Sequence, residues 1–335
     1  MTSSVAIGCD GKIPPETSIQ RVTIRRAGMS AVLMTWGATL QGFYRDGDEK
    51  SFVLGSSSFD AYLADLRHCG AIVGRVANRI ADGRAMIGET EVELERNENE
   101  ETTLHGGSLG ASVRNWELIG CDDISCVMQL TLGHGEGGFP GNLMLHATYY
   151  IEDDGALRLE IEGSTDATTL CNPAHHPYWN LNGSDRISDH RLRISADHYL
   201  PIGKDKIPLG HLQSVEETRF DFRSGRYVAL PGDEALDHNF CLSDCEDGHL
   251  REVCSLDAGG ARLTVETTEP GLQVYDGAHL GIGAHCGLAL EPQRWPDAPN
   301  HPNFPSILLK PGTTYRQTTR YRIQSIVQSA NQESP

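Results

Sequence analysis

Apolar and polar residues alternate one by one along much of the chain. In residues 142–151, NLMLHATYYI, the apolar side chains fall on one face of an extended strand: Leu143, Leu145, Ala147, Tyr149 and Ile151. Residues 155–163 and 313–324 alternate in the same way, and weaker alternation runs through 31–43, 125–132, 190–197 and 261–268. Asp-Gly pairs lie between such segments, for example at 46–47 and 154–155. A period of two interrupted by turn residues predicts half-buried antiparallel strands.

Helical periodicity is scarce. Residues 57–70, SSFDAYLADLRHCG, carry Ser57 and Asp60 at capping-box spacing, with Phe59, Tyr62, Leu63 and Leu66 on one helical face. We therefore expect one short helix there. We find no repeat and no linker, so the sequence predicts one all-β domain over residues 1–335, a sandwich of twisted antiparallel sheets. Residues 1–15 and 326–335 are expected to be frayed.

The net charge of the chain limits the classes of ligand and macromolecule that it is expected to bind. The chain has 28 basic and 46 acidic residues, a formal net charge of −18. Such a surface repels nucleic acid and anionic membranes and does not favour phosphorylated substrates. The nine cysteines are scattered without a metal-binding spacing, no apolar run has membrane-spanning length, and the first residues predict no signal peptide. We expect a reduced cytoplasmic protein that acts on a neutral small molecule and has no nucleic-acid or membrane partner.

A carboxylate stands at the end of one apolar run. Residues 288–306 read LALEPQRWPDAPNHPNFPS, where Glu291 follows three apolar residues and precedes five prolines. Burial there raises the pKa of a carboxyl group, and Pro292 is expected to end the strand. The pattern fits a base fixed beside a pocket, and it equally fits a plain corner between a strand and a loop.

Each of several further polar residues can be interpreted either as part of a binding site or as a purely structural residue. His105 precedes Gly106 and Gly107, whose backbone can approach a ligand closely or simply form a turn. Of the adjacent His175 and His176, only one can face a given cavity on an extended chain. Five further candidate polar residues occur in the motifs GRVANRI, LDHNF and PGLQVYDG: Arg75, Asn78, Arg79, Asp237 and Gln273. Ion pairs and turns explain each alone, but together they suit acid–base chemistry on a neutral polyol.

One glycine-rich run can be set aside. Residues 133–142, GHGEGGFPGN, have no lysine and no helix after them, and strands are expected on both sides. They predict a hairpin loop and not a phosphate-binding loop. No metal or nucleotide signature is present elsewhere.

Six motifs occur in the order and rough spacing of one family. GRVANRI, LHGG, HHPYWNLNG, DHNF, PGLQVYDG and LEPQRWPDAPNHPNFPSILLKPG resemble the aldose 1-epimerase (galactose mutarotase) family, from about residue 36 to 323. The resemblance implies a β-supersandwich that interconverts the α and β anomers of a free aldose without a cofactor or a metal. The substrate would be galactose, glucose or a pentose, and the protein a monomer or homodimer.

The same resemblance implies roles for particular residues. Glu291 is similar to the general base at the C1 hydroxyl, His176 to the general acid at the ring oxygen, and His105 to a second active-site histidine. The residues similar to those that hold the sugar hydroxyls are Asn78, Arg79, Asp237 and Gln273. Because the acid and the base exchange roles, we expect both pKa values near the working pH, with that of Glu291 raised only moderately and opposed by Arg79.

Alternatives remain open. His175, Trp179, Pro292, Arg294 and Val76 depart from the family pattern and leave the preferred aldose undecided. A hexose-6-phosphate epimerase of the same fold would need a basic cluster at its site. A non-catalytic sugar-binding protein would need no paired acid and base, and a metal hydrolase would need ligand spacings that the sequence lacks.

Overall fold

The computed structural model describes residues 18–228, 234–242 and 248–326. The expected frayed ends, 1–15 and all of 326–335 except Ile326, lie outside this part of the chain. The described residues are mostly strands and turns, as the alternation predicted, and the strands pair antiparallel. None of the described helices is long and apolar enough to cross a membrane.

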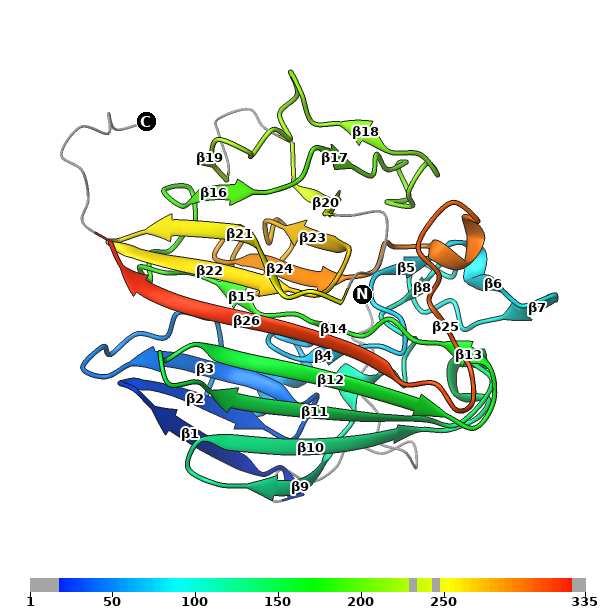
Figure 1. Cartoon of the computed structure of the whole chain (residues 1–335), viewed down its shortest axis with the longest axis horizontal. Helices are drawn as coiled ribbons and strands as arrows, with labels where there is room; N and C mark the ends of the chain where they lie inside the picture. Colours follow the sequence, from blue (N-terminus) through cyan, green and yellow to red (C-terminus); the bar gives the residue numbers. More distant parts are fainter. Residues whose placement is uncertain (1–17, 229–233, 243–247, 327–335) are drawn as a thin grey trace.

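The largest sheet has nine strands and one buried face (Figure 1). Its order is β19 (Arg226–Tyr227), β16 (Arg191–Ile194), β21 (Arg251–Ala258), β22 (Ala261–Thr267), β26 (Tyr315–Ser325), β12 (Leu157–Thr165), β11 (Leu143–Ile151), β10 (Ser125–Leu132) and β9 (Glu117–Cys121). On β11 the five apolar residues that alternation selected are all buried, which confirms the predicted face.

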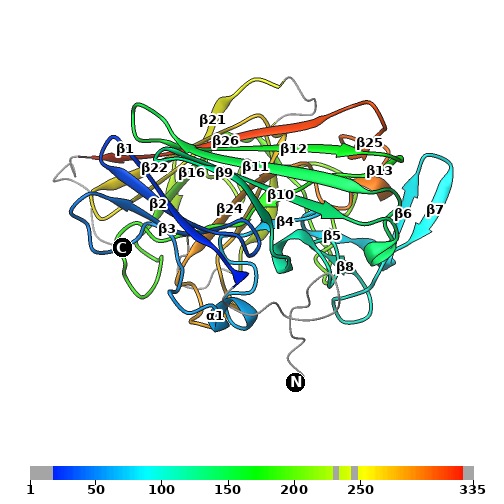
Figure 2. The same cartoon turned by 90° about the horizontal axis from the view of Figure 1, so that it is seen from below.

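A second sheet carries the residues of interest. Its six strands are ordered β15 (Tyr178–Trp179), β24 (Leu288–Gln293), β23 (Gly271–Tyr275), β20 (Asp237–Cys241), β17 (His198–Tyr199) and β18 (Gln213–Ser214). Figure 2 shows β24 on one side of the layer formed by β11, β12 and β26. Tyr149 and Ile161 of the large sheet and Leu272 and Leu290 of the second share one buried apolar cluster. The two sheets therefore pack as a sandwich over a common core.

Short strands complete the fold around the edges. A three-stranded sheet contains β1 (Arg21–Arg26), β2 (Met29–Met34) and β3 (Thr39–Arg45). Paired strands are β4 (Ile72–Val73) with β14 (Ala174–His175), β5 (Arg79–Ile80) with β8 (Thr103–Leu104), β6 (Arg84–Ile87) with β7 (Thr90–Glu93), and β13 (Thr169–Leu170) with β25 (Leu308–Leu309). Single 3₁₀ turns lie at Ala81–Gly83, Ala111–Val113, Glu136–Gly138 and Ala298–Asn300.

The expected helix is much shorter than its periodicity suggested. The helix α1 covers only Asp60–Leu63, and its N-cap is Phe59, which makes no side-chain capping bond, so the predicted Ser57 cap is wrong. Phe59, Tyr62 and Leu66 are nevertheless buried, as predicted for that face. Packing of these apolar side chains orders the segment as a series of turns without a capped helix.

The strand that contains Glu291 continues past it, contrary to the prediction. β24 includes Pro292, which pairs with Leu272, and Gln293, which pairs with Gly271. Beyond Ala289, β24 pairs only with β23, because β15 ends there. Proline is tolerated on such an edge. The side-chain amide of Gln317 donates to the Pro292 carbonyl over 2.7 Å and fixes the backbone next to Glu291 from the opposite sheet.

The glycine-rich residues 133–142 form the predicted connection between β10 and β11. Arg75, 1% exposed, holds this loop from inside. Its guanidinium donates to the carbonyls of Leu132, Gly133 and Pro140 at 2.7–3.0 Å. Arg75 is therefore a structural residue, neither a surface ion pair nor a ligand donor.

Candidate active site

Three neighbouring strands present polar side chains on one face of the six-stranded sheet. Gln273 on β23 pairs directly with Glu291 on β24 and with Asn239 on β20, and Asp237 lies two residues before Asn239. Directly paired antiparallel residues point to the same side, as do residues two apart. The sheet therefore presents Asp237, Gln273 and Glu291 together. The alternate positions supply Leu272 and Leu290 to the core behind them.

The adjacent histidines point in opposite directions, as predicted. Nδ1 of His175 lies 3.1 Å from the Tyr321 hydroxyl, and its Nε2 lies 3.2 Å from the Gly70 carbonyl, so this ring belongs to the core. His176 follows β14 and faces the other way, with its Nε2 3.4 Å from Oε1 of Glu291. Oε2 of Glu291 is buried and accepts no hydrogen bond from the described residues.

Asn78 and His105 hold each other where β5 pairs with β8. The His105 N–H donates to the Asn78 carbonyl at 3.0 Å, and the Asn78 N–H donates to Nδ1 of His105 at 3.2 Å. In the neutral ring the proton is therefore on Nε2. Both residues are left-handed, with φ of 61° and 52°. A Cβ on Gly106 would come within 2.1 Å of the Gly74 carbonyl oxygen, so this glycine serves backbone packing instead of approach to a ligand.

A third histidine, His68, lies beside His105 and His176 and was not identified from the sequence. The ring centroids of His68 and His105 are 4.9 Å apart, and those of His105 and His176 are 5.5 Å apart. Nδ1 of His68 lies 2.9 Å from the Ser112 hydroxyl. The residue lies in the segment interpreted as a helix, where periodicity gives no sign that its ring packs on His105.

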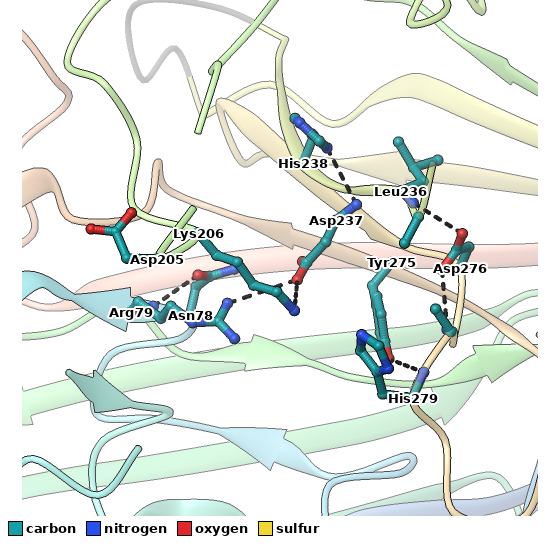
Figure 3. A network of polar contacts seen from close by, with 12 residues as sticks. Asn78, Arg79, Asp205, Lys206, Leu236, Asp237, His238, Tyr275, Asp276 and His279 are labelled. Carbon is teal, nitrogen blue, oxygen red and sulfur yellow. Dashed lines mark hydrogen bonds and ion pairs between the residues drawn. The ribbon is translucent and has the colours of Figure 1, made fainter. Parts of the chain in front are cut away.

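The remaining candidates belong to one network of charged and amide groups, part of which Figure 3 shows. Arg79 donates from Nε and Nη2 to the two carboxylate oxygens of Glu98 at 2.7 and 2.8 Å. Its Nη1 lies 3.8 Å from Oδ2 of Asp237, and the Lys206 ammonium lies 3.1 Å from the same oxygen. The Gln273 amide donates to Oδ1 of Asp237 at 2.7 Å. Sequence reasoning found Arg79, Asp237 and Gln273 but missed Glu98 and Lys206.

Exposure increases across the site in one direction. The side chains of Glu291 and His176 are 3% and 6% exposed, whereas those of Asp237 and Lys206 are 15% and 36% exposed. The facing pair of Glu291 and His176 is thus deeply buried, and Lys206 lies towards solvent.

Burial drives the deep pair towards uncharged forms. It raises the pKa of Glu291 well above its ordinary 4.5; the Asp237 carboxylate raises it further, and the Arg79 guanidinium opposes this. Burial lowers the pKa of His176 to about 4 and that of His68 to about 3, and it lowers the pKa of His105 well below its usual 6.5. The moderate shift expected for Glu291 is wrong, because burial of the carboxyl outweighs the opposing Arg79 guanidinium.

We expect Glu291→Gln to stabilise the fold at neutral pH. Below the unfolded pKa near 4.5 the carboxyl is protonated in both states and costs nothing. As pH rises above that value, the unfolded chain releases a proton that the folded chain retains, so the wild type loses stability. Urea unfolding should show a larger gain in stability for the variant at pH 7.5 than at pH 4.5; equal gains at both pH values would contradict this account.

The described residues contain no group of three or more His, Cys, Asp or Glu side chains arranged to hold a metal ion.

Comparison with known proteins places these residues in a wider context. The family model described as Aldose 1-epimerase matches residues 20–322. The chain is 36% identical to the galactose mutarotase of Mus musculus over 324 residues, covering 91% of this chain and 94% of that one. It is equally 36% identical to the aldose 1-epimerase of Escherichia coli K12 over 327 residues, with 90% and 94% covered.

Solved structures agree with this similarity. The fold matches an aldose epimerase homologue from C. elegans with a TM-score of 0.86 at 28% identity, over 92% of this chain and 100% of that one. It matches galactose 1-epimerase from Lactobacillus acidophilus with a TM-score of 0.80, also at 28% identity, over 92% and 99%.

Proposed function

The chain belongs to the aldose 1-epimerase family, and from this premise we propose that Glu291 and His176 interconvert the anomers of a free aldose by opening and closing its ring. The observation that carries this proposal is the 3.4 Å separation between Nε2 of His176 and Oε1 of Glu291. A hemiacetal carbon bears its hydroxyl oxygen and its ring oxygen side by side. Because Glu291 and His176 lie this close together, one of them can contact the hydroxyl oxygen while the other contacts the ring oxygen.

Ring opening requires the charged forms of the pair. Glu291 as carboxylate takes the proton from the C1 hydroxyl, and His176 as imidazolium gives a proton to the ring oxygen while the C1–O5 bond breaks. The product is an open-chain aldehyde, with Glu291 protonated and His176 neutral. Rotation about C1–C2 then presents the other face of the carbonyl. In ring closure, Glu291 protonates the carbonyl oxygen and His176 removes the proton from the C5 hydroxyl, which restores the starting state.

The protonation that burial favours is that of the middle of this cycle. Burial favours a protonated Glu291 and a neutral His176, which is the form that closes the open-chain sugar. The form that opens a ring has the same number of protons and differs only by transfer of one proton within the pair. Sugar hydroxyls that donate to the unpartnered Oε2 of Glu291 would stabilise its carboxylate and allow that transfer.

The surrounding residues suit a neutral, hydroxyl-rich ligand. His105, neutral and protonated at Nε2, can donate a hydrogen bond to a sugar oxygen. Beside Glu291, Asp237 offers carboxylate acceptors and Gln273 offers an amide. Asn78 and Arg79 are the remaining residues that we propose contact the sugar. The cations of this network, Arg79 and Lys206, are each paired with a carboxylate. This pairing disfavours a hexose-6-phosphate as the substrate, because a phosphate would need positive charge that is not already neutralised.

Polarimetry tests the proposed activity directly. Freshly dissolved α-D-glucose, α-D-galactose and α-D-xylose would be followed with and without the wild-type protein, with EDTA present throughout. We expect faster approach to rotational equilibrium for at least one sugar. If the protein accelerates none of them, the proposed reaction is wrong.

We also expect a bell-shaped pH profile whose limbs depend on Asp237. The reactive pair holds one proton, so kcat/KM falls as pH drops through the His176 pKa of about 4 and as pH rises through the raised Glu291 pKa. The negative charge of Asp237 raises both pKa values, so Asp237→Asn should move both limbs to lower pH. The pH values of the two limbs are compared between wild type and Asp237→Asn, because the maximum value of kcat/KM also depends on how well each protein binds the sugar. Limbs that stay in place or move to higher pH would contradict the assignment.

A further inference from the structure

Lys206 is held at the exposed end of the site by a tight turn. The Gly203 N–H donates to the Ile207 carbonyl at 2.8 Å, and the Lys206 N–H donates to the Gly203 carbonyl at 3.0 Å. Lys206 itself is left-handed, with φ of 63°, a conformation that is unfavourable for a residue with a side chain. The turn nevertheless keeps a lysine at this position, and its side chain reaches Asp237 (Figure 3).

The ion pair between Lys206 and Asp237 leaves hydrogen-bonding capacity on both partners. An ammonium has three N–H donors, and a carboxylate has about four acceptor positions. Asp237 takes one donor from Lys206 at 3.1 Å and one from Gln273 at 2.7 Å. Both side chains keep some exposure, 36% for Lys206 and 15% for Asp237. A ligand at this end of the site would therefore meet a free donor and a free acceptor side by side.

Lys206 is better placed than Arg79 to be that donor. Nε and Nη2 of Arg79, one edge of its guanidinium, are committed to Glu98, and the remaining nitrogen, Nη1, lies 3.8 Å from Asp237. The Gln273 amide nitrogen already donates to Asp237. The ammonium of Lys206 rotates freely about its stem and can keep its bond to Asp237 while a second N–H turns towards the ligand.

We propose that Lys206 is a specificity-determining residue that, together with Asp237, recognises two adjacent hydroxyl groups of the sugar. One hydroxyl donates to Asp237, and its neighbour accepts from Lys206. The ligand class is thus an aldose with a vicinal diol whose oxygens lie gauche, since only then do both oxygens face the 3.1 Å pair. The inference rests on the proposed epimerase activity and adds a requirement on the substrate.

The test compares three variants on deoxy sugars. Lys206→Met removes the donor and keeps the stem, and Lys206→Arg restores a donor. Lys204→Met, in the same turn and exposed, is the matched control. For D-glucose or D-galactose, whichever wild type converts faster, we expect Lys206→Met to lower kcat/KM roughly 10–100-fold, the usual worth of a hydrogen bond to a charged group. The loss should lie mainly in KM, with partial rescue by Lys206→Arg and no change in Lys204→Met.

The decisive readout is the coupling between Lys206 and one hydroxyl. With the 2-, 3- and 4-deoxy sugars, the penalty of Lys206→Met should disappear for the derivative that lacks the hydroxyl bound by Lys206 and persist for at least one other. A penalty equal on all derivatives, or no penalty on the parent sugar, would overturn the proposal. Calorimetric binding of the same sugars to wild type and Lys206→Met repeats the comparison without turnover. An inactive wild type would thus refute the epimerase proposal while binding still decides the role of Lys206.

Discussion

Replacing Glu291 with Gln is expected to lower kcat roughly 10²–10⁴-fold, the usual contribution of a positioned acid or base. The substitution keeps the size of the side chain and removes the carboxylate that we propose accepts the C1 proton. The Oε1 atom that faces His176 at 3.4 Å would become an amide oxygen or nitrogen that cannot take up a proton. Polarimetry on the best aldose, with active-site occupancy checked by sugar binding, measures the loss.

The stability of this variant separates chemistry from folding. Because the buried carboxyl opposes folding at neutral pH, Glu291→Gln should be inactive and yet more resistant to urea than wild type. Glu291→Asp, which keeps a carboxylate but withdraws it by one methylene, should retain an intermediate rate. A Gln variant that is folded and turns over within a few fold of wild type would exclude Glu291 as the base.

Replacing His176 with Asn is expected to cause a loss of similar size, roughly 10²–10⁴-fold in kcat. Asparagine can still donate a hydrogen bond but cannot deliver a proton to the ring oxygen. In the proposed mechanism the two groups act as one proton-exchanging pair, so the double variant Glu291→Gln/His176→Asn should be little slower than either single variant. If the loss of kcat in the double variant equals the product of the two single losses, the two residues contribute independently to catalysis.

The adjacent histidine supplies the matched control. His175 has the same chemistry one residue away, but its ring contacts Tyr321 and the Gly70 carbonyl in the core. His175→Asn should therefore reduce stability by about 1–3 kcal/mol, the cost of disturbing a buried hydrogen-bonded group, and leave kcat near that of wild type. Urea unfolding and polarimetry on the same preparations distinguish the two histidines.

Much of the site could be predicted because its residues lie in alternating strands. The sequence places Gln273 on a predicted strand and Glu291 at the end of an apolar run, and the strand register shows that the two residues pair directly. The opposite orientation of His175 and His176 follows from the same geometry. Motif order supplied Asn78, Arg79, His105 and Asp237, whose neighbours along the chain carry no such signal.

What escaped prediction depends on contacts between distant segments. Lys206 lies in a turn, and nothing nearby in sequence shows that its ammonium reaches Asp237, 31 positions away. The strand end at Pro292 was wrong because the effect of a proline depends on whether a neighbouring strand needs its N–H, which the local sequence does not contain. The size of the Glu291 pKa shift likewise depends on burial by segments distant in the sequence, which outweighs the Arg79 guanidinium expected to limit it.

The strict alternation of β20, β23 and β24 also limits how this protein can diverge. One inserted or deleted residue in any of these strands would turn its polar side chains into the core and its apolar side chains towards the candidate site. Descendants can therefore exchange residues in these strands but cannot change their length. The turn from Gly203 to Pro208 is under no such constraint. New sugar preferences should accordingly arise by lengthening or shortening that turn, while the strands that bear Asp237, Gln273 and Glu291 align without gaps.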